Sequence, residues 1–96
     1  MKDSPNRSKS SFYRRLYVAH LISIGTNTFS GLLSDTGLPR RTLQEILKQL
    51  DDLDIVIERH GGTKNKVYSI SAWSSIDKDW VAENVVYVKR MAQVDN

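Results

Sequence analysis

The sequence predicts an α+β fold of mainly helical content, in which three helices form the core, a β-hairpin follows and a further helix ends the chain. The clearest observation is the segment "TLQEILKQLDDL", residues 42–53, where apolar residues recur at helical spacing and form one buried face. A second observation is a pair of β-rich stretches, 55–60 and 66–72, which flank a glycine-opened turn. The length of 96 residues suits one domain.

The first expected helix covers residues 10–25 and follows a polar, basic tail over residues 1–9 that we expect to be flexible. Its apolar residues lie on more than one side, with Leu16 on one side and Val18 and Ile22 on another. A helix that is apolar on several sides is buried on several sides. We therefore expect one face to pack on the core and another to meet a second subunit.

The second and third expected helices follow each other closely. Thr28 is a good N-cap for a short second helix, and Gly37 is a good residue to end it. The third helix is expected from about Pro39, which suits a first helical turn, to Leu53. Two short helices joined by a glycine-containing turn are the signature of a helix-turn-helix.

The hairpin and the last helix complete the chain. "IVIERH" (55–60) is rich in β-branched residues, and "KVYSISA" (66–72) alternates apolar and polar residues, so both are expected to be strands. Ser74 and Asp77 stand at capping-box spacing, and a single final helix is expected over residues 76–92.

The charges of the third helix oppose its dipole. Arg40 and Arg41 stand at the positive N-terminal end, and Asp51, Asp52 and Asp54 stand at the negative C-terminal end. Each such charge costs about 0.3–1 kcal/mol on an exposed surface. Local rules of this kind are broken where function requires it.

The ordered set of elements resembles the winged helix-turn-helix transcription regulators of the MarR-like and IclR-like superfamily. The resemblance covers about residues 12–72 and is carried by "FSGLLSDTGLPRRTLQEILKQLDDLDIVIER" followed by "GGTKNKVYSI". It implies that the third helix enters the DNA major groove N-terminal end first, with its acidic end away from the duplex. One departure is Asp54, where similar proteins often have glycine in a left-handed turn.

The residues expected to contact double-stranded DNA lie in the third helix and the hairpin. Arg41 can pair with guanine, Gln44 with adenine and Glu45 with cytosine, while Lys48 is expected to meet phosphate and Thr42 either phosphate or a thymine methyl. The full expected set is Pro39, Arg40, Arg41, Thr42, Gln44, Glu45 and Lys48 in the third helix, and Arg59, Lys64, Asn65 and Lys66 in the hairpin.

Structural alternatives remain open for several of these residues. Arg41 and Glu45, four residues apart, can pair on a solvated face. The segment 64–66 can be an ordinary polar hairpin tip. Arg59 can reach phosphate or pair with Glu58 or Asp54.

We expect a homodimer formed by the first and last helices, with residues 10–75 as the DNA-binding domain and 76–96 as the dimerisation element. The expected interface consists of Val18, Ile22, Trp80, Val81, Val85, Val88 and Met91. The alternative is a winged-helix protein-protein interaction module within a larger assembly, because a fold alone does not establish a function.

Composition argues against other classes of function. The chain has no cysteine and only His20 and His60, so we expect no metal site and no cofactor. His20 is expected to be structural, since it lies in a largely apolar helix. No acid-base constellation or glycine-rich phosphate loop indicates an enzyme. The N-terminus is polar and no apolar run approaches a membrane span, so the cytoplasm is the default location. The net charge of +3 is compatible with a polyanionic partner.

Overall fold

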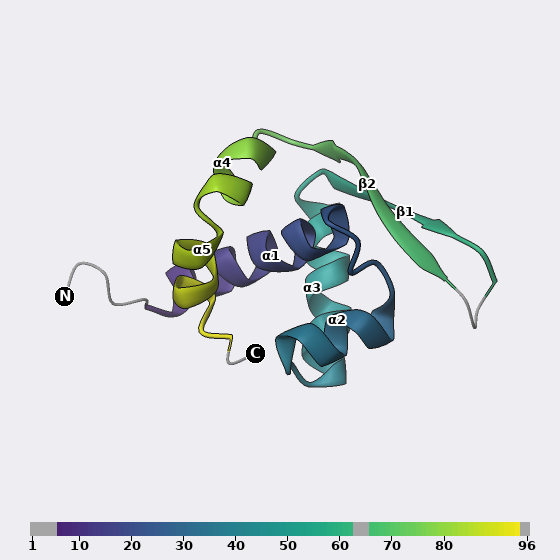
Figure 1. The fold of residues 1–96 in the computed structure, drawn as a ribbon, viewed down its shortest axis with the longest axis horizontal. Helices are drawn as coiled ribbons and strands as arrows, with labels where there is room; N and C mark the ends of the chain where they lie inside the picture. The colour runs from purple at the N-terminus through teal and green to yellow at the C-terminus, as the bar shows by residue number, and fades with distance from the viewer. Residues whose placement is uncertain (1–5, 63–65, 95–96) are drawn as a thin grey trace.

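The computed structural model describes residues 6–62 and 66–94, and it is mainly helical with one two-stranded sheet (Figure 1). The elements in chain order are α1 (Arg7–Ser23), α2 (Phe29–Thr36), α3 (Arg40–Asp52), β1 (Ile55–His60), β2 (Val67–Trp73), α4 (Lys78–Glu83) and α5 (Val85–Ala92). This order confirms the predicted fold class, with a three-helix core, a hairpin and further helix at the C-terminus.

The first helix begins earlier than predicted. The Asn6 side chain accepts a hydrogen bond from the backbone N–H of Lys9 at 2.8 Å, so Asn6 caps a helix that starts at Arg7. Residues 7–9 are therefore helical, and the predicted tail over residues 1–9 is too long. Residues 1–5 lie outside the described part of the chain.

The second face of α1 is covered by the chain's own C-terminal helices, which corrects the predicted dimer interface. Figure 1 shows α5 lying across α1, with α4 between α5 and the hairpin. Five of the expected interface residues are buried within the single chain: Val18, Ile22, Val81, Val88 and Met91. Val85 is partly buried against the same core, and Trp80 is 42% exposed. The two-sided pattern of α1 thus indicates two layers of one chain rather than a subunit contact.

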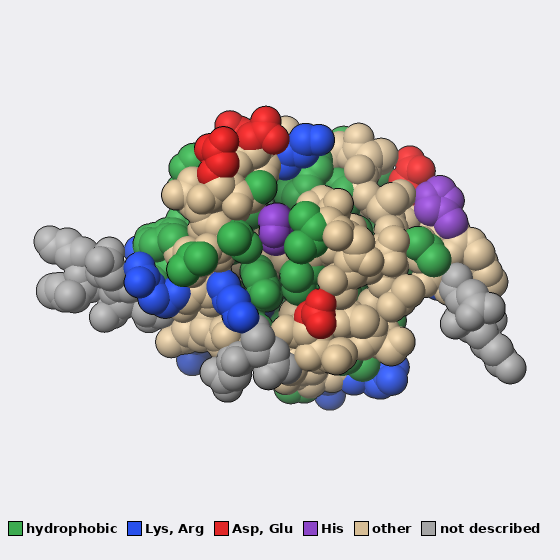
Figure 2. Space-filling model, in the orientation of Figure 1, with side chains coloured by type: hydrophobic (Ala, Val, Ile, Leu, Met, Phe, Trp, Pro, Cys, Tyr) green, Lys and Arg blue, Asp and Glu red, His purple; other side chains and the backbone are tan. Residues whose placement is uncertain are grey.

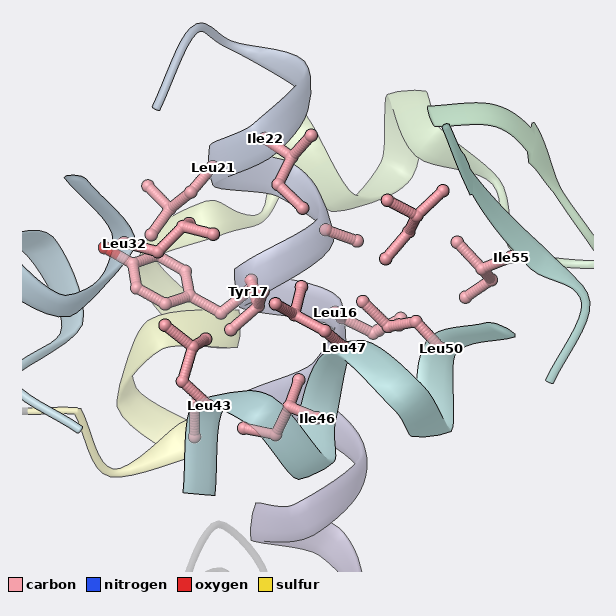
Figure 3. Close-up of a cluster of buried hydrophobic side chains, with 14 of the residues drawn as sticks. Leu16, Tyr17, Leu21, Ile22, Leu32, Leu43, Ile46, Leu47, Leu50 and Ile55 are labelled. Carbon is pink, nitrogen blue, oxygen red and sulfur yellow. The ribbon is translucent and has the colours of Figure 1, made fainter. Parts of the chain in front are cut away.

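The core holds α3 in place through its apolar face. Leu32 from α2 and Leu43 and Leu50 from α3 are fully buried, and Leu16 of α1 and Ile55 of β1 belong to the same cluster. Figure 3 shows side chains from α1, α2, α3 and β1 converging on this cluster. The apolar spacing seen in the sequence is therefore the packing face of α3.

The turn between α2 and α3 forms as predicted. Thr28 Oγ1 accepts from the N–H of Gly31 at 3.1 Å, which caps α2, and Gly37 ends the helix with a left-handed φ of 69°. The buried Thr36 hydroxyl accepts from the N–H of Leu38 and donates to the carbonyl of Leu32. These bonds set the direction in which α3 leaves α2.

The hairpin is antiparallel and pairs Ile55 with Trp73 at one end and His60 with Val67 at the other. Strand β2 covers residues 67–73, one residue later than predicted. The N–H of Tyr68 donates to the carbonyl of Asn27 at 2.8 Å, which ties the hairpin to the α1–α2 loop. The hairpin is thus anchored beside the start of α2.

The predicted single helix over residues 76–92 is wrong, because it is broken at Asn84. The Asn84 side chain donates to the carbonyl of Trp80 at 2.8 Å, and its ψ of 26° lies outside the helical region. Asparagine side chains compete with helical hydrogen bonds in this way. The predicted capping box also fails, since Asp77 alone caps α4 through the N–H groups of Asp79 and Trp80, and Ser74 has a φ of 57°.

The corner between α3 and β1 has the left-handed geometry for which similar proteins use glycine. Asp54 has a φ of 66°, and its N–H donates to the carbonyl of Asp51 at 3.0 Å. An L-residue pays a steric penalty in this region, and a carboxylate is unfavourable at a helix C-terminus. Asp54 is therefore a strained residue that the rest of the fold holds in position.

We expect Asp54→Gly to raise the free energy of unfolding by about 0.5–1 kcal/mol, because relief of strain and charge outweighs the extra freedom of glycine in the unfolded chain. Asp54→Asn removes only the charge and should stabilise less. Urea unfolding of the three proteins measures the difference. A destabilised glycine variant would show that the carboxylate itself stabilises the corner.

His20 gives the fold a predictable dependence on pH. It is 8% exposed in the last turn of α1, and burial lowers the pKa of its imidazole below the ordinary value. The unfolded chain, with a histidine pKa of about 6.5, then binds more protons than the folded chain at slightly acidic pH. The stability contributed by neutral His20 is present above about pH 6.5 and is lost as the pH falls toward the folded-state pKa.

We expect the free energy of unfolding to decline less steeply between about pH 7.5 and pH 5.5 in His20→Gln than in the wild type. Urea unfolding at several pH values gives both curves, and carboxylate titration contributes to each of them alike. Parallel curves would exclude His20 as the source of the pH dependence.

Candidate nucleic-acid interface

A groove of about 780 Å³ separates α3 from the hairpin and opens beside the N-terminus of α2. Its lining comes from α2, α3 and both strands or their immediate flanks. The lining residues are Thr28, Phe29, Ser30, Arg40, Gln44, Leu47, Lys48, Asp51, Arg59, Lys66, Val67 and Tyr68. Four of them are Lys or Arg and one is Asp, so the groove favours an anionic partner.

The exposed side of α3 supplies the polar wall of this groove. Arg40, Gln44 and Lys48 are four residues apart, so they form one row along the helix. All three are exposed, while Leu43 and Leu50 are buried on the other side. The helix therefore presents two cations with an amide between them to the groove.

Arg40 is positioned by an aromatic ring that the sequence did not indicate. Its guanidinium lies 5.0 Å from the centre of the Phe29 ring, within the range of a cation–π contact. Phe29 is the first residue of α2, so the contact holds the charge of Arg40 near the N-terminus of that helix. Arg40 also begins α3, and helix N-termini present positive potential to an anion.

Arg59, near the turn end of β1, is held by Asp51, a residue not expected to take part. Its Nη2 lies 3.2 Å from Asp51 Oδ2, and its Nη1 donates to the carbonyl of Ile57 at 3.2 Å. Asp51 Oδ1 in turn accepts from the N–H of Ile57 at 3.3 Å. The two predicted pairing partners are therefore wrong: Arg59 pairs with neither Glu58, which lies 3.8 Å from His60, nor Asp54, while the predicted contact with phosphate stays a prediction.

Asp51 changes the explanation of the reversed charges in α3. The sequence predicts that the acidic end lies away from the duplex, but Asp51 lines the groove. Its two contacts join the end of α3 to β1. The unfavourable charge of Asp51 at the C-terminal end of α3 thus has a structural role. This role does not explain the unfavourable charges of Arg40 and Arg41 at the N-terminal end.

Four predicted residues in α3 and at its N-cap, Pro39, Arg41, Thr42 and Glu45, do not line the groove. Pro39, Arg41 and Glu45 are exposed, and Thr42 is partly buried. The ion pairs of the described residues do not include one between Arg41 and Glu45. Of the hairpin tip, Lys66 lines the groove, whereas Lys64 and Asn65 lie outside the described residues.

One cluster of acidic side chains lies away from this interface, although Asp51 lines the groove itself. Figure 2 shows this cluster over α4 at the upper left, where Asp77, Asp79 and Glu83 belong to α4 and its cap, while Lys and Arg side chains appear along the lower edge near α2 and α3. In residues 6–62 and 66–94, no group of three or more His, Cys, Asp or Glu side chains is placed to hold a metal ion. None of the helices in these ranges has the length and apolar character that a membrane crossing requires.

Together, the turn between α2 and α3, the exposed face of α3 and the adjoining hairpin define a winged helix-turn-helix domain. A family model described as "Winged helix-turn helix" matches residues 7–92, and the chain belongs to this family. The match confirms the fold expected from the resemblance, while the narrower MarR-like and IclR-like assignment stays a prediction. This fold is typical of DNA-binding proteins rather than enzymes.

Among solved structures, the chain is similar to the crystal structure of a DUF2131 family protein from Shewanella amazonensis SB2B. The two sequences are 31% identical, and the TM-score is 0.85. The alignment covers 97% of this chain and 93% of that one, so the similarity extends over both proteins almost entirely. No curated protein matches the chain.

Proposed function

We propose that the protein binds double-stranded DNA sequence-specifically and acts as a small dimeric transcription regulator, with α3 in the major groove and the hairpin on the backbone or in the minor groove. The observation that carries this proposal is the basic groove, in which Arg40 and Lys48 of α3 face Lys66 of the hairpin beside the N-terminus of α2. A helix N-terminus and separated cations match successive phosphates of a duplex.

Each polar residue on the exposed side of α3 has a chemical role in this proposal. Arg40 and Lys48 contact phosphates, and Gln44 between them reaches a base edge, where its amide pairs best with adenine. Arg41 lies on the neighbouring side of the helix, and the ion pairs of the described residues leave it unpaired with Glu45, so its guanidinium can pair with guanine. In this proposal Arg40 positions the helix on the phosphate backbone, and Arg41 recognises a base.

Titration of a fluorescent random duplex pool at several salt concentrations tests the proposal. The logarithm of the binding constant should fall linearly with the logarithm of salt concentration, with a slope of about −0.9 per phosphate contact. Selection of the tightest-bound sequences should then yield a preferred site. Failure to bind any duplex at low salt, together with binding to an acidic protein partner, would instead establish the interaction-module alternative.

The proposed dimer requires a surface other than the one predicted from the sequence, since most residues of the predicted interface are buried within the single chain. Two large apolar side chains remain exposed on the C-terminal helices, Trp80 at 42% and Val86 at 78%. We propose that they form the contact between subunits, and that the dimer reads two half-sites about one duplex turn apart.

We expect the protein to sediment at about twice the chain mass of 11.0 kDa at micromolar concentration, and Val86→Glu to sediment as a monomer, because a buried unpaired carboxylate opposes the contact. Val56→Glu, at an exposed apolar position on β1, is the matched control and should leave the mass unchanged. A wild-type protein that sediments as a monomer with and without DNA would refute the dimer.

A further inference from the structure

A second pocket, of about 200 Å³, lies where α1 meets the corner between α3 and β1 and the loop between β2 and α4. It shares no residue with the groove described above. Its apolar lining comes from Phe12, Leu16, Leu53, Ile55 and Ile76. The pocket is therefore a separate, mostly apolar site that the DNA-binding proposal does not use.

One cation, Arg15, lines this pocket. Its Nε donates to Oε1 of Gln49 in α3 at 3.0 Å, which fixes the side chain between α1 and α3. Arg15 is partly buried, and the ion pairs found among the described residues belong to Arg59 and His60. Charges that are withdrawn from water are normally matched by an opposite charge, so the guanidinium is placed to receive an anion.

The size and chemistry of the pocket restrict that anion. An apolar cavity of about 150 Å³ is large enough for benzene, so this pocket accommodates one ring or a short alkyl chain. A guanidinium binds a carboxylate through two parallel hydrogen bonds, and the hydroxyl groups of Ser74 and Ser75 add donors to the lining. We propose that the pocket binds a small monocarboxylate, with the apolar part against Leu53 and Ile76 and the carboxylate on Arg15.

The lining disfavours phosphorylated ligands. A phosphate monoester carries nearly two negative charges, and the lining offers one cation among five apolar side chains. Desolvation of the second charge would then be uncompensated. A monoanion with a compact apolar body is the class that fits both parts of the pocket.

Titration of the ¹⁵N-labelled protein with sodium benzoate at constant ionic strength tests the proposal without DNA. The backbone amide signals of residues such as Leu16, Leu53 and Ser75 should shift and saturate. Benzyl alcohol, which has the same ring and no charge, should bind at least about tenfold more weakly, equivalent to about 1.4 kcal/mol. Equal affinity for the two compounds, or no saturable shift, would overturn the proposal.

Two variants identify the guanidinium as the cause of this preference. Arg15→Met keeps the apolar stem and should bind benzoate and benzyl alcohol equally. Arg90→Met makes the same substitution on α5, at an exposed position outside both the pocket and the groove, and should keep the preference. A retained preference in Arg15→Met would overturn the assignment, and if that variant does not fold, the comparison of the two compounds on the wild type decides alone. Since no duplex is present, the outcome is independent of the proposed DNA binding.

Discussion

Replacing Arg40 and Lys48 together by glutamine should remove most of the duplex affinity and leave the fold intact. Both side chains are exposed, and both line the groove, so the double variant can no longer neutralise two phosphates of the duplex. Hydrogen bonds to charged groups contribute about 1.5–3 kcal/mol each, so the affinity should fall well over tenfold. The salt slope should shrink by about one for each phosphate that is no longer neutralised.

The stability of this double variant is the second half of the prediction. Glutamine at position 40 relieves a cation at the N-terminus of α3 but removes the cation–π interaction with the Phe29 ring. These effects oppose each other, and each is at most about 1 kcal/mol on an exposed surface. The melting temperature should therefore change little. Duplex titration and thermal unfolding of the same sample measure both quantities.

A matched control distinguishes DNA binding through a specific interface from binding through the overall positive charge of the chain. Arg7 and Arg90 are exposed on α1 and α5, outside the groove, and their joint replacement by glutamine changes the net charge by the same amount. This control should keep nearly all of the duplex affinity. An equal decrease in the two double variants would mean that the chain binds DNA through its overall charge, and α3 would no longer have its assigned role.

The elements with strong local signals are those that the sequence predicted well. The sequence predicts the buried face of α3 because Leu43 and Leu50 repeat at helical spacing. It predicts both ends of α2 because Thr28 and Gly37 act through hydrogen bonds to residues nearby in the chain. Arg40, Gln44 and Lys48 form a row at the same periodicity, but the sequence did not separate them from Arg41 and Glu45, which do not line the groove. These parts of the site depend on local geometry alone.

Some errors are local, such as the missed break at Asn84 and the missed N-cap at Asn6, whereas the errors that bear on the site and the dimer concern contacts between distant segments. The pattern of α1 shows that Val18 and Ile22 are buried, but the identity of the covering surface is decided by α4 and α5, which lie far along the chain. Asp51 reaches Arg59 only because Asp54 turns the chain between them with a positive φ. Neither the surface that covers α1 nor the partner of Arg59 can be predicted from the sequence alone. Residue spacing along a helix shows on which side a residue lies, but it does not show which segment packs against that side.

Leu50→Ala should lower the free energy of unfolding by about 2–5 kcal/mol, since Leu50 is fully buried where α3 meets the core and its truncation leaves a cavity. The whole stability of a domain of this kind is about 5–15 kcal/mol, so the variant should be partly unfolded on moderate warming. Leu53→Ala, at a residue that is 47% exposed at the end of the same helix, is the control and should cost much less.

Comparison of Leu50→Ala with the double glutamine variant of Arg40 and Lys48 distinguishes a defect of the core from a defect of the interface. Leu50→Ala changes the buried face of α3, and the double variant changes its exposed face. A duplex that binds only the folded state adds about 2.7 kcal/mol of stability at a concentration about one hundred times its dissociation constant. Leu50→Ala keeps Arg40 and Lys48, so such a duplex should raise its melting temperature. The melting temperature of the double glutamine variant should rise far less at the same duplex concentration. Without duplex, its melting temperature should be higher than that of Leu50→Ala. Thermal unfolding with and without duplex gives all four values. A double glutamine variant that gains as much stability from the duplex as Leu50→Ala does would show that α3 does not carry the DNA contact.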